Sequence, residues 1–287
     1  MDSVTENAGK IDIDHLRGWI GNEESLTETL TSTLAARLNA TLDRDASSDA
    51  GHEAPLMIHH CLCQPAPPTA SLGVDGHSTR GGFLPPVSLP RRMWAGGALS
   101  FHSPLKIGED VTRRSVVDDV VLKQGQAGPL CFVTVTHRFS ASGRAILTER
   151  QDIVYLDVAP PGKTSTRQRP AATPGDDRRE IAATPELLFR YSALTFNSHR
   201  IHYDQPYATD EEGYPGLVVH GPLQAMLLIQ YAAELRKRAP VRFSFRSLSS
   251  LFAGGSFFLN ASEESGRLKL WTAGKEGPVA MEAYAEW

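Results

Sequence analysis

The stretch FNSHRIHYD concentrates residues that bind or transfer protons among large apolar side chains. Asn197, His199, Arg200, His202 and Asp204 are among its polar residues. Histidine is the side chain whose ordinary pKa lies near neutrality, so His202 is a candidate general acid and base. An arginine in the same stretch suits a carboxylate or phosphate, because its planar group makes paired hydrogen bonds.

A second segment, GLVVHGP, ends in His220, Gly221 and Pro222. Proline favours the first turn of a helix, and the next residues are apolar on nearly every side, so a buried helix should begin here. The free N–H groups at a helix N-terminus can hold a carbonyl oxygen that becomes negative, and glycine lets a ligand approach closely. A polarised carbonyl beside a histidine base is the minimum set of groups for removing a proton from the carbon atom next to that carbonyl.

Each of these residues also has a simpler interpretation. His202 could be a hydrogen-bonded core histidine, and Arg200 a surface arginine. Asp204 fits a turn or a cap better than a catalytic acid, and GLVVHGP could be only a well-packed helix entry. His199, His202 and His220 could bind zinc together, but no carboxylate or cysteine completes the familiar ligand sets.

The composition is that of a globular protein. The chain has 287 residues, of which 41% are hydrophobic and 22% charged, and a net charge of −4. It has no long basic block, which argues against a nucleic-acid surface. It has no apolar run of the roughly 18 residues that a membrane span needs, and its N-terminus resembles neither a signal nor a transit peptide. We therefore expect a cytoplasmic protein.

The three cysteines, Cys61, Cys63 and Cys131, are an odd number, which predicts free thiols. The cluster HHCLC, from His59 to Cys63, looks like a metal site. Its residues alternate with apolar neighbours, however, which favours a strand whose successive side chains point to opposite faces. Because Cys-x-Cys alone is not a zinc spacing, we expect no metal here.

A four-residue spacing of leucines predicts a helix in the first half, with Ser25 or Asn22 as its cap. The leucines are Leu26, Leu30, Leu34, Leu38 and Leu42. Residues 70–97 are rich in glycine and proline and predict a long ordered loop, which is often functional. Residues 131–139 and 146–156 alternate as strands, and ASGR is the expected hairpin turn between them.

Residues 160–180 have almost no apolar side chains and predict an interdomain linker. Thr184 should cap a short helix that runs to about Leu194. The long helix that Pro222 opens should end at Pro240, and VRFSFRSL, RLKLWTAG and VAMEAYAEW should follow as antiparallel strands. Each half then has one long helix followed by strands, which predicts an α+β tandem.

Three segments of the sequence resemble a known family. YSALTFNSHRIHYDQPYA followed by YPGLVVHGPLQAMLL resembles the MaoC-like hydratases and dehydratases of acyl thioesters. GGFLPPVSLPRRMWAGGALSFHSPLKIGE resembles the first half of double hot-dog proteins in the group of type 2 hydroxyacyl-thioester dehydratases and mesaconyl-C4-CoA hydratases. The resemblance implies a tandem hot-dog fold, with a long central helix wrapped by an antiparallel sheet in each half. Its domains would be residues 11–159 and 181–287.

The (R)-specific enoyl-CoA hydratases of this family carry the pattern Asp-x-Asn-Pro-x-His and then His-Gly. The histidine falls on His202, the aspartate on Asn197, the asparagine on His199, the proline on Arg200 and the oxyanion-hole glycine on Gly221. Asn197 departs from the family's acid, so His202 would make both proton transfers. That implies syn addition and a rate that rises near the ordinary histidine pKa of about 6.5. The second half would be catalytic, and the first half would form the wall of the acyl pocket.

The resemblance implies reversible hydration of the α,β double bond of an enoyl-CoA, without a metal or redox cofactor. The leading substrate is mesaconyl-C4-CoA or a related dicarboxylic acyl-CoA. The residues expected to contact it, besides the catalytic His202, Asn197 and Gly221, are His199, Arg200, His220, Arg91 and Arg92. One alternative is a 3-hydroxyacyl-ACP or -CoA dehydratase of fatty-acid metabolism, and another is a non-catalytic acyl-CoA-binding protein. A homodimer is left open.

Overall fold

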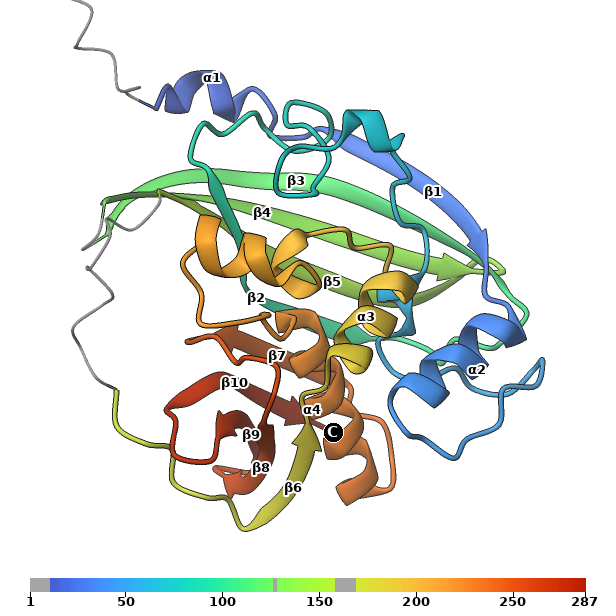
Figure 1. Ribbon diagram of the computed structural model, residues 1–287. Coiled ribbons are helices and arrows are strands. Elements are labelled where there is room, and N and C mark those ends of the chain that lie inside the picture. Colours follow the sequence, from blue (N-terminus) through green and yellow to red (C-terminus); the bar gives the residue numbers. More distant parts are fainter. Residues whose placement is uncertain (1–10, 126–127, 158–168) are drawn as a thin grey trace, which may run out of the picture.

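The computed structural model describes residues 11–125, 128–157 and 169–287 of the chain. Ten described segments are strands of one antiparallel sheet, which bends around the helices (Figure 1). The strands are β1 (Glu23–Thr29), β2 (Arg91–Phe101), β3 (Asp110–Gly125), β4 (Gly128–Ala141), β5 (Arg144–Leu156), β6 (Asp177–Ala182), β7 (Arg242–Ser247), β8 (Ser256–Glu264), β9 (Arg267–Gly274) and β10 (Val279–Glu286). Their order across the sheet is β1-β3-β4-β5-β2-β7-β10-β9-β8-β6.

The sheet has two halves that follow the two halves of the sequence. Strands β1 to β5 form one end and β6 to β10 the other, and β2 pairs with β7 at the seam. A Cβ atom on Gly97 would lie only 2.8 Å from the carbonyl oxygen of Arg150 and 2.9 Å from Cζ of Phe245, so glycine is needed for this close approach. The predicted α+β class is confirmed, as are the strands expected at β4, β5, β7, β9 and β10.

The helices are α1 (Ile13–Arg17), α2 (Ser32–Thr41), α3 (Pro185–Leu194) and α4 (Gly221–Arg236). Helix α4 is buried throughout residues 223–232 and packs against β7 to β10. Lys237 ends it in the left-handed conformation, with φ 53°, shortly before Pro240. Helix α3 begins as predicted, because Thr184 Oγ1 accepts a hydrogen bond from the backbone N–H of Leu187 at 3.1 Å.

The helix expected from the leucine repeat is wrong in its first part. Leu26 lies in β1, which pairs with β3, and α2 begins only at Ser32. Thr31 caps α2, in place of the expected Ser25 or Asn22. Residues four apart lie on the same face of a strand as well as of a helix, so the leucine repeat could not distinguish a helix from a strand. Helix α2 has ten residues and packs on α3, so the described part of the first half holds no long central helix.

Three other segments differ from expectation. HHCLC is not a strand, because Ile58–Cys61 form a 3-10 turn, and the whole cluster is buried. The predicted loop ends at Pro90, where β2 begins with Arg91. The predicted linker contains the start of β6 at Asp177. This strand lies at the edge of the sheet, where charged side chains are common, so its lack of apolar residues resembled a linker. Residues 160–168 of that linker lie outside the described residues. Strand β8 was not expected.

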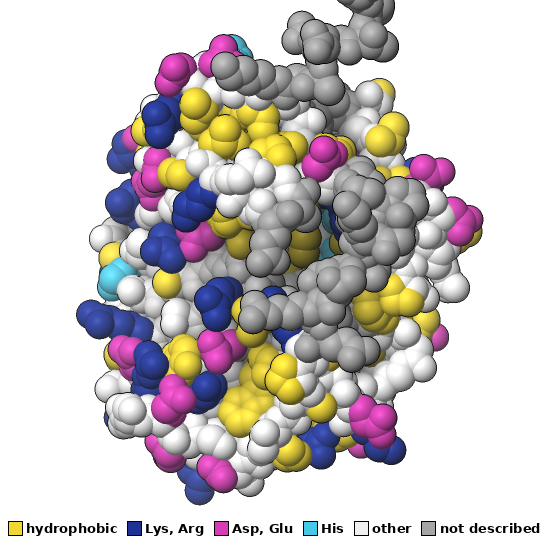
Figure 2. Space-filling view, turned by 90° about the vertical axis from the view of Figure 1, so that its left-hand side faces the viewer, with side chains coloured by type: hydrophobic (Ala, Val, Ile, Leu, Met, Phe, Trp, Pro, Cys, Tyr) yellow, Lys and Arg dark blue, Asp and Glu magenta, His cyan; other side chains and the backbone are white. Residues whose placement is uncertain are grey.

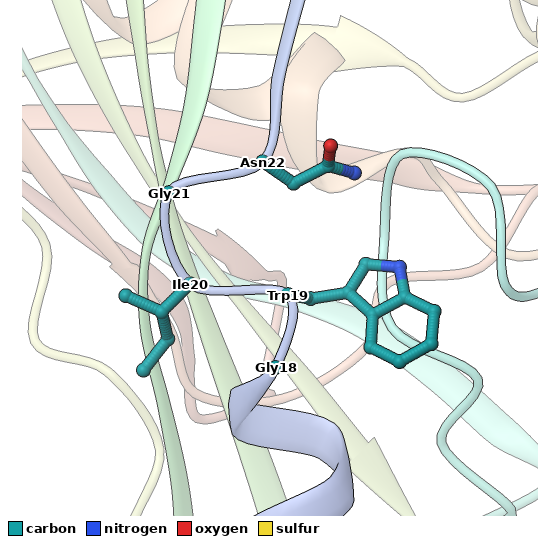
Figure 3. Close-up of a pocket in the computed structure, with 5 residues that line it drawn as sticks. All are labelled: Gly18, Trp19, Ile20, Gly21 and Asn22. Carbon is teal, nitrogen blue, oxygen red and sulfur yellow. The ribbon is translucent and has the colours of Figure 1, made fainter.

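The segment after α1 anchors the loop that leads to β2. The side chains of Trp19 and Asn22 point to the same side of a small hollow formed by residues 18–22 (Figure 3). Trp19 Nε1 donates to the carbonyl oxygen of Gly82 at 3.0 Å, and Asn22 Nδ2 donates to that of Phe83 at 2.9 Å. The loop is therefore tied to the sheet at this end.

The visible surface is mixed in charge. On the face turned to the viewer in Figure 2, acidic and basic side chains are interspersed with small hydrophobic patches. The described side chains of this face show both signs side by side, as the small net charge leads one to expect. Among the described residues, no helix is long and apolar enough to cross a membrane. The three cysteines are free and buried, as predicted.

Candidate active site

A cleft of about 1280 Å³ lies between the two halves of the molecule. Strands β2 to β5 and the loop before β2 line it from the first half, and the FNSHRIHYD segment and the first turn of α4 line it from the second. The expected site residues among its lining are Asn197, His199, His202, Gly221, Arg91 and Arg92.

The backbone ahead of α4 holds His202 in one tautomer. Nδ1 of His202 lies 2.7 Å from the carbonyl oxygen of Val218, so Nδ1 donates its proton there and Nε2 keeps its lone pair. Burial lowers the pKa of His202 to about 4, the bond to Val218 opposes this shift, and His77 adds to it. The imidazole is therefore neutral at pH 7 and can accept a proton on Nε2.

His220 supports His202 from behind. The two rings are stacked, with centroids 3.6 Å apart and planes 20° apart. Nε2 of His220 shares a hydrogen bond of 2.8 Å with Ser192 Oγ, and the side chain is fully buried. Burial lowers the pKa of His220 well below its ordinary value. His220 does not line the cleft, so the structure places it as a support for His202 and not at the expected substrate contact.

Asn197 and His199 lie side by side in the cleft wall. Asn197 Oδ1 accepts a hydrogen bond from the backbone N–H of His199 at 3.0 Å. The Nδ2 group of the Asn197 side chain can then donate to a ligand in the cleft. The His199 ring meets that of His202 edge to face, with centroids 5.4 Å apart. Burial, and then His77 and His202, lower the pKa of His199 to about 2, so this ring is neutral as well.

Helix α4 points its first turn into the cleft. Gly221 is its first residue, Pro222 follows, and no side chain caps the N–H groups of this turn. A Cβ atom on Gly221 would meet Ser247 Oγ at 3.6 Å, which is ordinary contact. The turn can therefore offer an N–H group to a ligand oxygen, and the helix dipole favours a negative charge there.

Arg200 is engaged in structural contacts. Its Nε and Nη2 donate to Asp204 Oδ2 at 2.9 and 2.7 Å, and its Nη1 donates to the carbonyl oxygen of Val74 at 3.0 Å. Its guanidinium also lies over the ring of Tyr207. Because Arg200 does not line the cleft, its expected contact with a substrate carboxylate has no support in this geometry. Asp204 serves this ion pair, in line with its structural interpretation.

The other two candidate arginines differ in their partners. Arg91 Nε forms an ion pair with Glu212 Oε2 at 3.0 Å, and its guanidinium lies over the ring of Tyr214. Arg92 also lines the cleft, and no hydrogen-bond acceptor or carboxylate pairs with it in the described part of the chain. It is close enough to the histidines to lower the pKa of His199. Arg92 is thus the arginine best placed to receive an anionic ligand.

Sequence reasoning missed two residues of the loop before β2. Asp75 Oδ2 accepts a hydrogen bond from Nδ1 of His77 at 2.9 Å, and both residues line the cleft. The rings of His77 and His199 lie 4.1 Å apart between centroids. The length and glycine content of the loop indicated a function, but neither locates Asp75 or His77. Their position follows from how the loop folds back on the second half.

The cleft wall formed by the first half contains many polar groups. Arg113 Nη2 donates to Glu24 Oε1 at 2.6 Å, and Nδ1 of His137 shares a hydrogen bond of 2.7 Å with Ser115 Oγ. Several buried polar atoms around this part of the cleft have no hydrogen-bond partner among the described residues: Trp94 Nε1, Tyr155 Oη, His60 Nδ1 and Arg113 Nε. A hydrocarbon chain would leave them unpaired, which is costly, whereas a polar group could pair with some of them.

Two polar clusters have the composition of small metal sites. His60 Nε2 lies 2.8 Å from Glu149 Oε1, and His59 Nε2 lies 3.4 Å from Glu149 Oε2. These three residues form one cluster, and Asp75, His77 and His199 form the other. The cysteines of HHCLC belong to neither. Burial raises the pKa of Glu149 in the first cluster, but its interactions with His60 and His59 outweigh this effect and lower that pKa.

Comparison with known proteins identifies relatives. The family model of hydroxyacyl-thioester dehydratase type 2 matches residues 57–253. The chain is 44% identical over 232 residues to a mesaconyl-C(4)-CoA hydratase of Chloroflexus aurantiacus, covering 81% of this chain and 83% of the relative. It is 28% identical to the mitochondrial hydroxyacyl-thioester dehydratase type 2 of Schizosaccharomyces pombe, covering 71% of this chain and 76% of the relative.

Solved structures share the fold. A MaoC-like dehydratase from Phytophthora capsici superposes with a TM-score of 0.67 at 16% identity, covering 96% of this chain and 99% of that one. A Mycobacterium tuberculosis protein described as a double hot-dog fold gives a TM-score of 0.52 at 13% identity, covering 93% and 96%. At such identities the likeness concerns the hot-dog fold alone.

The buried histidines predict a loss of stability in weak acid. The pKa values of His202 and His137 are lowered to about 4, chiefly by burial, whereas both would bind a proton near pH 6.5 in the unfolded chain. Between these values the unfolded state binds more protons. The free energy of unfolding should therefore be at its maximum above about pH 6.5 and fall as the pH decreases, by up to about 1.4 kcal/mol per histidine and pH unit.

Urea unfolding at pH 7.5, 6.0 and 5.0 measures this dependence. The variant His137→Gln should show a shallower slope than the wild type, because it removes one titrating group. An unfolding free energy that stays constant from pH 7.5 to 5.0 would mean that these histidines are protonated in the folded state.

Proposed function

Because this chain belongs to the hydroxyacyl-thioester dehydratase type 2 family, we propose that it is a hydro-lyase that adds water reversibly across the α,β double bond of an enoyl-CoA thioester. One juxtaposition carries the proposal. The neutral His202, whose Nε2 keeps its lone pair, lines the same cleft as the uncapped first turn of α4. These are the base and the carbonyl polariser that the reaction requires.

The proposed reaction needs only these groups and water. Nε2 of His202 takes a proton from water, whose oxygen bonds to the β-carbon, and the π electrons move onto the thioester oxygen at the Gly221 N–H. His202 then delivers its proton to the α-carbon, and the other water hydrogen stays on the new hydroxyl. Asn197 positions the water. The addition is redox-neutral, so no redox cofactor is required, and we propose that no metal is required either.

The pH dependence differs from the expectation for an ordinary histidine. With its pKa at about 4, His202 is already neutral at pH 6. The acidic limb of kcat/KM should therefore lie near pH 4 instead of pH 6.5.

We propose that the two halves are tandem hot-dog domains, residues 11–159 and 181–287, joined by a linker. The separation of the sheet into two sets of five strands supports two such units, although the second set begins with β6 at Asp177, ahead of residue 181. The first half contributes a cleft wall in place of a long central helix, and the second half contributes His202 and α4. The tandem supplies the paired unit within one chain, so activity does not depend on a homodimer.

The substrate proposed is mesaconyl-C4-CoA or a related dicarboxylic acyl-CoA. The relative that is 44% identical carries that substrate in its name, and the cleft here contains the unpaired Arg92 and a polar wall. The rival is a 3-hydroxyacyl dehydratase acting on plain acyl chains, which the family name favours. A panel of charged and uncharged enoyl-CoA thioesters separates the two. Turnover of any of them excludes a non-catalytic acyl-CoA-binding protein.

Replacing His202 tests the base. His202→Ala should lower kcat on the order of 10²–10⁴-fold, because it removes the general acid and base. Circular dichroism should show that the fold is retained. His15→Ala, which changes an exposed histidine of α1, serves as the matched control and should keep full activity. Near-normal turnover by the His202 variant would remove this residue from the mechanism.

Replacing Gly221 tests the site of the thioester oxygen. Gly221→Ala should fold normally, because its Cβ would make only ordinary contacts. Gly221→Val should crowd the N–H group of the first turn and lower kcat by about 10²–10³-fold, comparable with the loss of one oxyanion donor. Steady-state kinetics of both variants measure the effect. Unchanged kinetics of the valine variant would place the carbonyl elsewhere.

Replacing arginines tests the substrate class. Arg92→Met should lower kcat/KM for a dicarboxylic thioester. The loss of transition-state binding free energy should be roughly 1.5–3 kcal/mol, the contribution of a hydrogen bond to a charged group. The effect on an uncharged enoyl-CoA should be much smaller. Arg200→Met is the matched control, because Arg200 is paired with Asp204 outside the cleft lining. Equal losses on both substrates by the Arg92 variant would assign this arginine to the CoA moiety or to structure.

A further inference from the structure

We propose that Asp75 and His77 form a second catalytic pair, which the first half of the chain contributes to the hydration site. In this proposal Nε2 of His77 accepts one hydrogen of the attacking water while Nε2 of His202 removes the other. Asp75 fixes the tautomer of His77, and its negative charge acts on His77 and His199. The inference rests on the proposed function and extends it to residues outside the catalytic segment.

The Asp75 turn is built to dock on the catalytic segment. The backbone N–H of Arg200 donates to the carbonyl oxygen of Asp75 at 2.9 Å, and Ser198 Oγ donates to that of Gly76 at 2.5 Å. Gly76 has φ +86°, and a Cβ atom there would lie 1.9 Å from the carbonyl oxygen of Ser198. Only glycine fits this contact. The contacts fix Asp75 and His77 relative to the histidines of the second half.

The tautomer of His77 is set by Asp75. The carboxylate accepts hydrogen bonds from Nδ1 and from the backbone N–H of His77, both at 2.9 Å. The proton therefore sits on Nδ1, and Nε2 keeps a lone pair. His77 lines the cleft, as His202 does, and the rings of both contact that of His199. A water molecule held by two such nitrogen atoms through its hydrogens has its oxygen lone pairs free to attack the β-carbon.

Asp75 is the carboxylate of the cleft that faces the histidines. In the described part of the chain, three carboxylates line the cleft, and two are paired with arginines: Glu24 with Arg113 and Glu212 with Arg91. Asp75 is paired with His77 instead. Burial opposes its ionisation, but the hydrogen bonds and the charge interaction with His77 outweigh it and lower the pKa of Asp75. The carboxylate is thus ionised at pH 7.

This carboxylate compensates for Asn197. An imidazolium formed on His202 would be buried, and the Nδ1 partner of His202 is a neutral carbonyl group. Burying an unpaired charge is costly, and a nearby carboxylate reduces that cost. Asn197 cannot supply a charge. Asp75 supplies a negative charge from the other half of the molecule, and that charge acts on His77 and on His199, whose ring contacts that of His202.

The charged and titratable groups around His77 set the direction of the pH test. Burial lowers the pKa of His77, its bond to Asp75 raises it, and Arg92 and Arg80 lower it. His199 and His202 also face this group. Removing the negative charge of Asp75 should lower the pKa of His77 and of His199, the two histidines on which that charge acts. The acidic limb of kcat/KM should therefore move to lower pH in Asp75→Asn while kcat decreases.

The experiment compares Asp75→Asn, His77→Phe and the double variant in hydration of an enoyl-CoA thioester. Phenylalanine keeps a ring against His199 but has no lone pair, so His77→Phe should lower kcat on the order of 10²-fold with little change in KM. Asp75→Asn should lower kcat by about tenfold or more, and the double variant should lose no more than His77→Phe, because Asp75 acts largely through His77. Asp204→Asn removes an equal charge outside the cleft lining and should leave the pH limb in place.

Two results would overturn this inference alone: a normal kcat for His77→Phe in an enzyme that His202→Ala inactivates, or an unmoved pH limb in Asp75→Asn. Stoichiometric metal that is required for wild-type activity and is lost in His77→Phe would also overturn it, because Asp75, His77 and His199 would then be ligands. A wild-type protein that hydrates no enoyl-CoA would instead contradict the proposed function, and this inference with it.

Discussion

The hydrogen bond from Nδ1 of His202 to the carbonyl oxygen of Val218 determines the chemistry of the cleft. It holds the proton on one nitrogen and leaves the other as a base, and the stacked ring of His220 keeps that orientation. Burial then keeps the imidazole neutral. At neutral pH His202 is therefore unprotonated and can act as a base, but its protonated form is high in free energy because the side chain is buried. The surrounding charges must lower that free energy during turnover.

Both halves of the chain line the cleft in which this base lies. The second half supplies His202 and the first turn of α4. The loop before β2 packs on the segment that holds His202 and brings His77 against His199. Trp19 and Asn22 hold that loop at Gly82 and Phe83, closer to β2. The cleft is therefore formed by the two halves together, and neither half alone would enclose it.

The sequence was most informative where local chemistry decides the structure. The caps and prolines of α3 and α4 predicted both helices, and one continuous segment predicted His202 and Asn197 together. Local patterns failed where two structures share a period, as in the leucine repeat around Leu26. They also failed where tertiary packing decides. Nothing near Arg200 indicates its pairing with Val74 in a distant loop, and nothing near Asp75 indicates that it would face the histidines.

The most direct test of the account is isotope incorporation by the wild-type protein. The enoyl-CoA thioester should be incubated in D₂O and, separately, in ¹⁸O-labelled water, and the products analysed by mass spectrometry and NMR. The account predicts an intact CoA thioester with labelled oxygen on the β-carbon and one deuterium on the α-carbon, delivered to the same face as the hydroxyl. Release of free CoA with labelled oxygen in a carboxylate, or addition to opposite faces, would contradict the proposed role of His202.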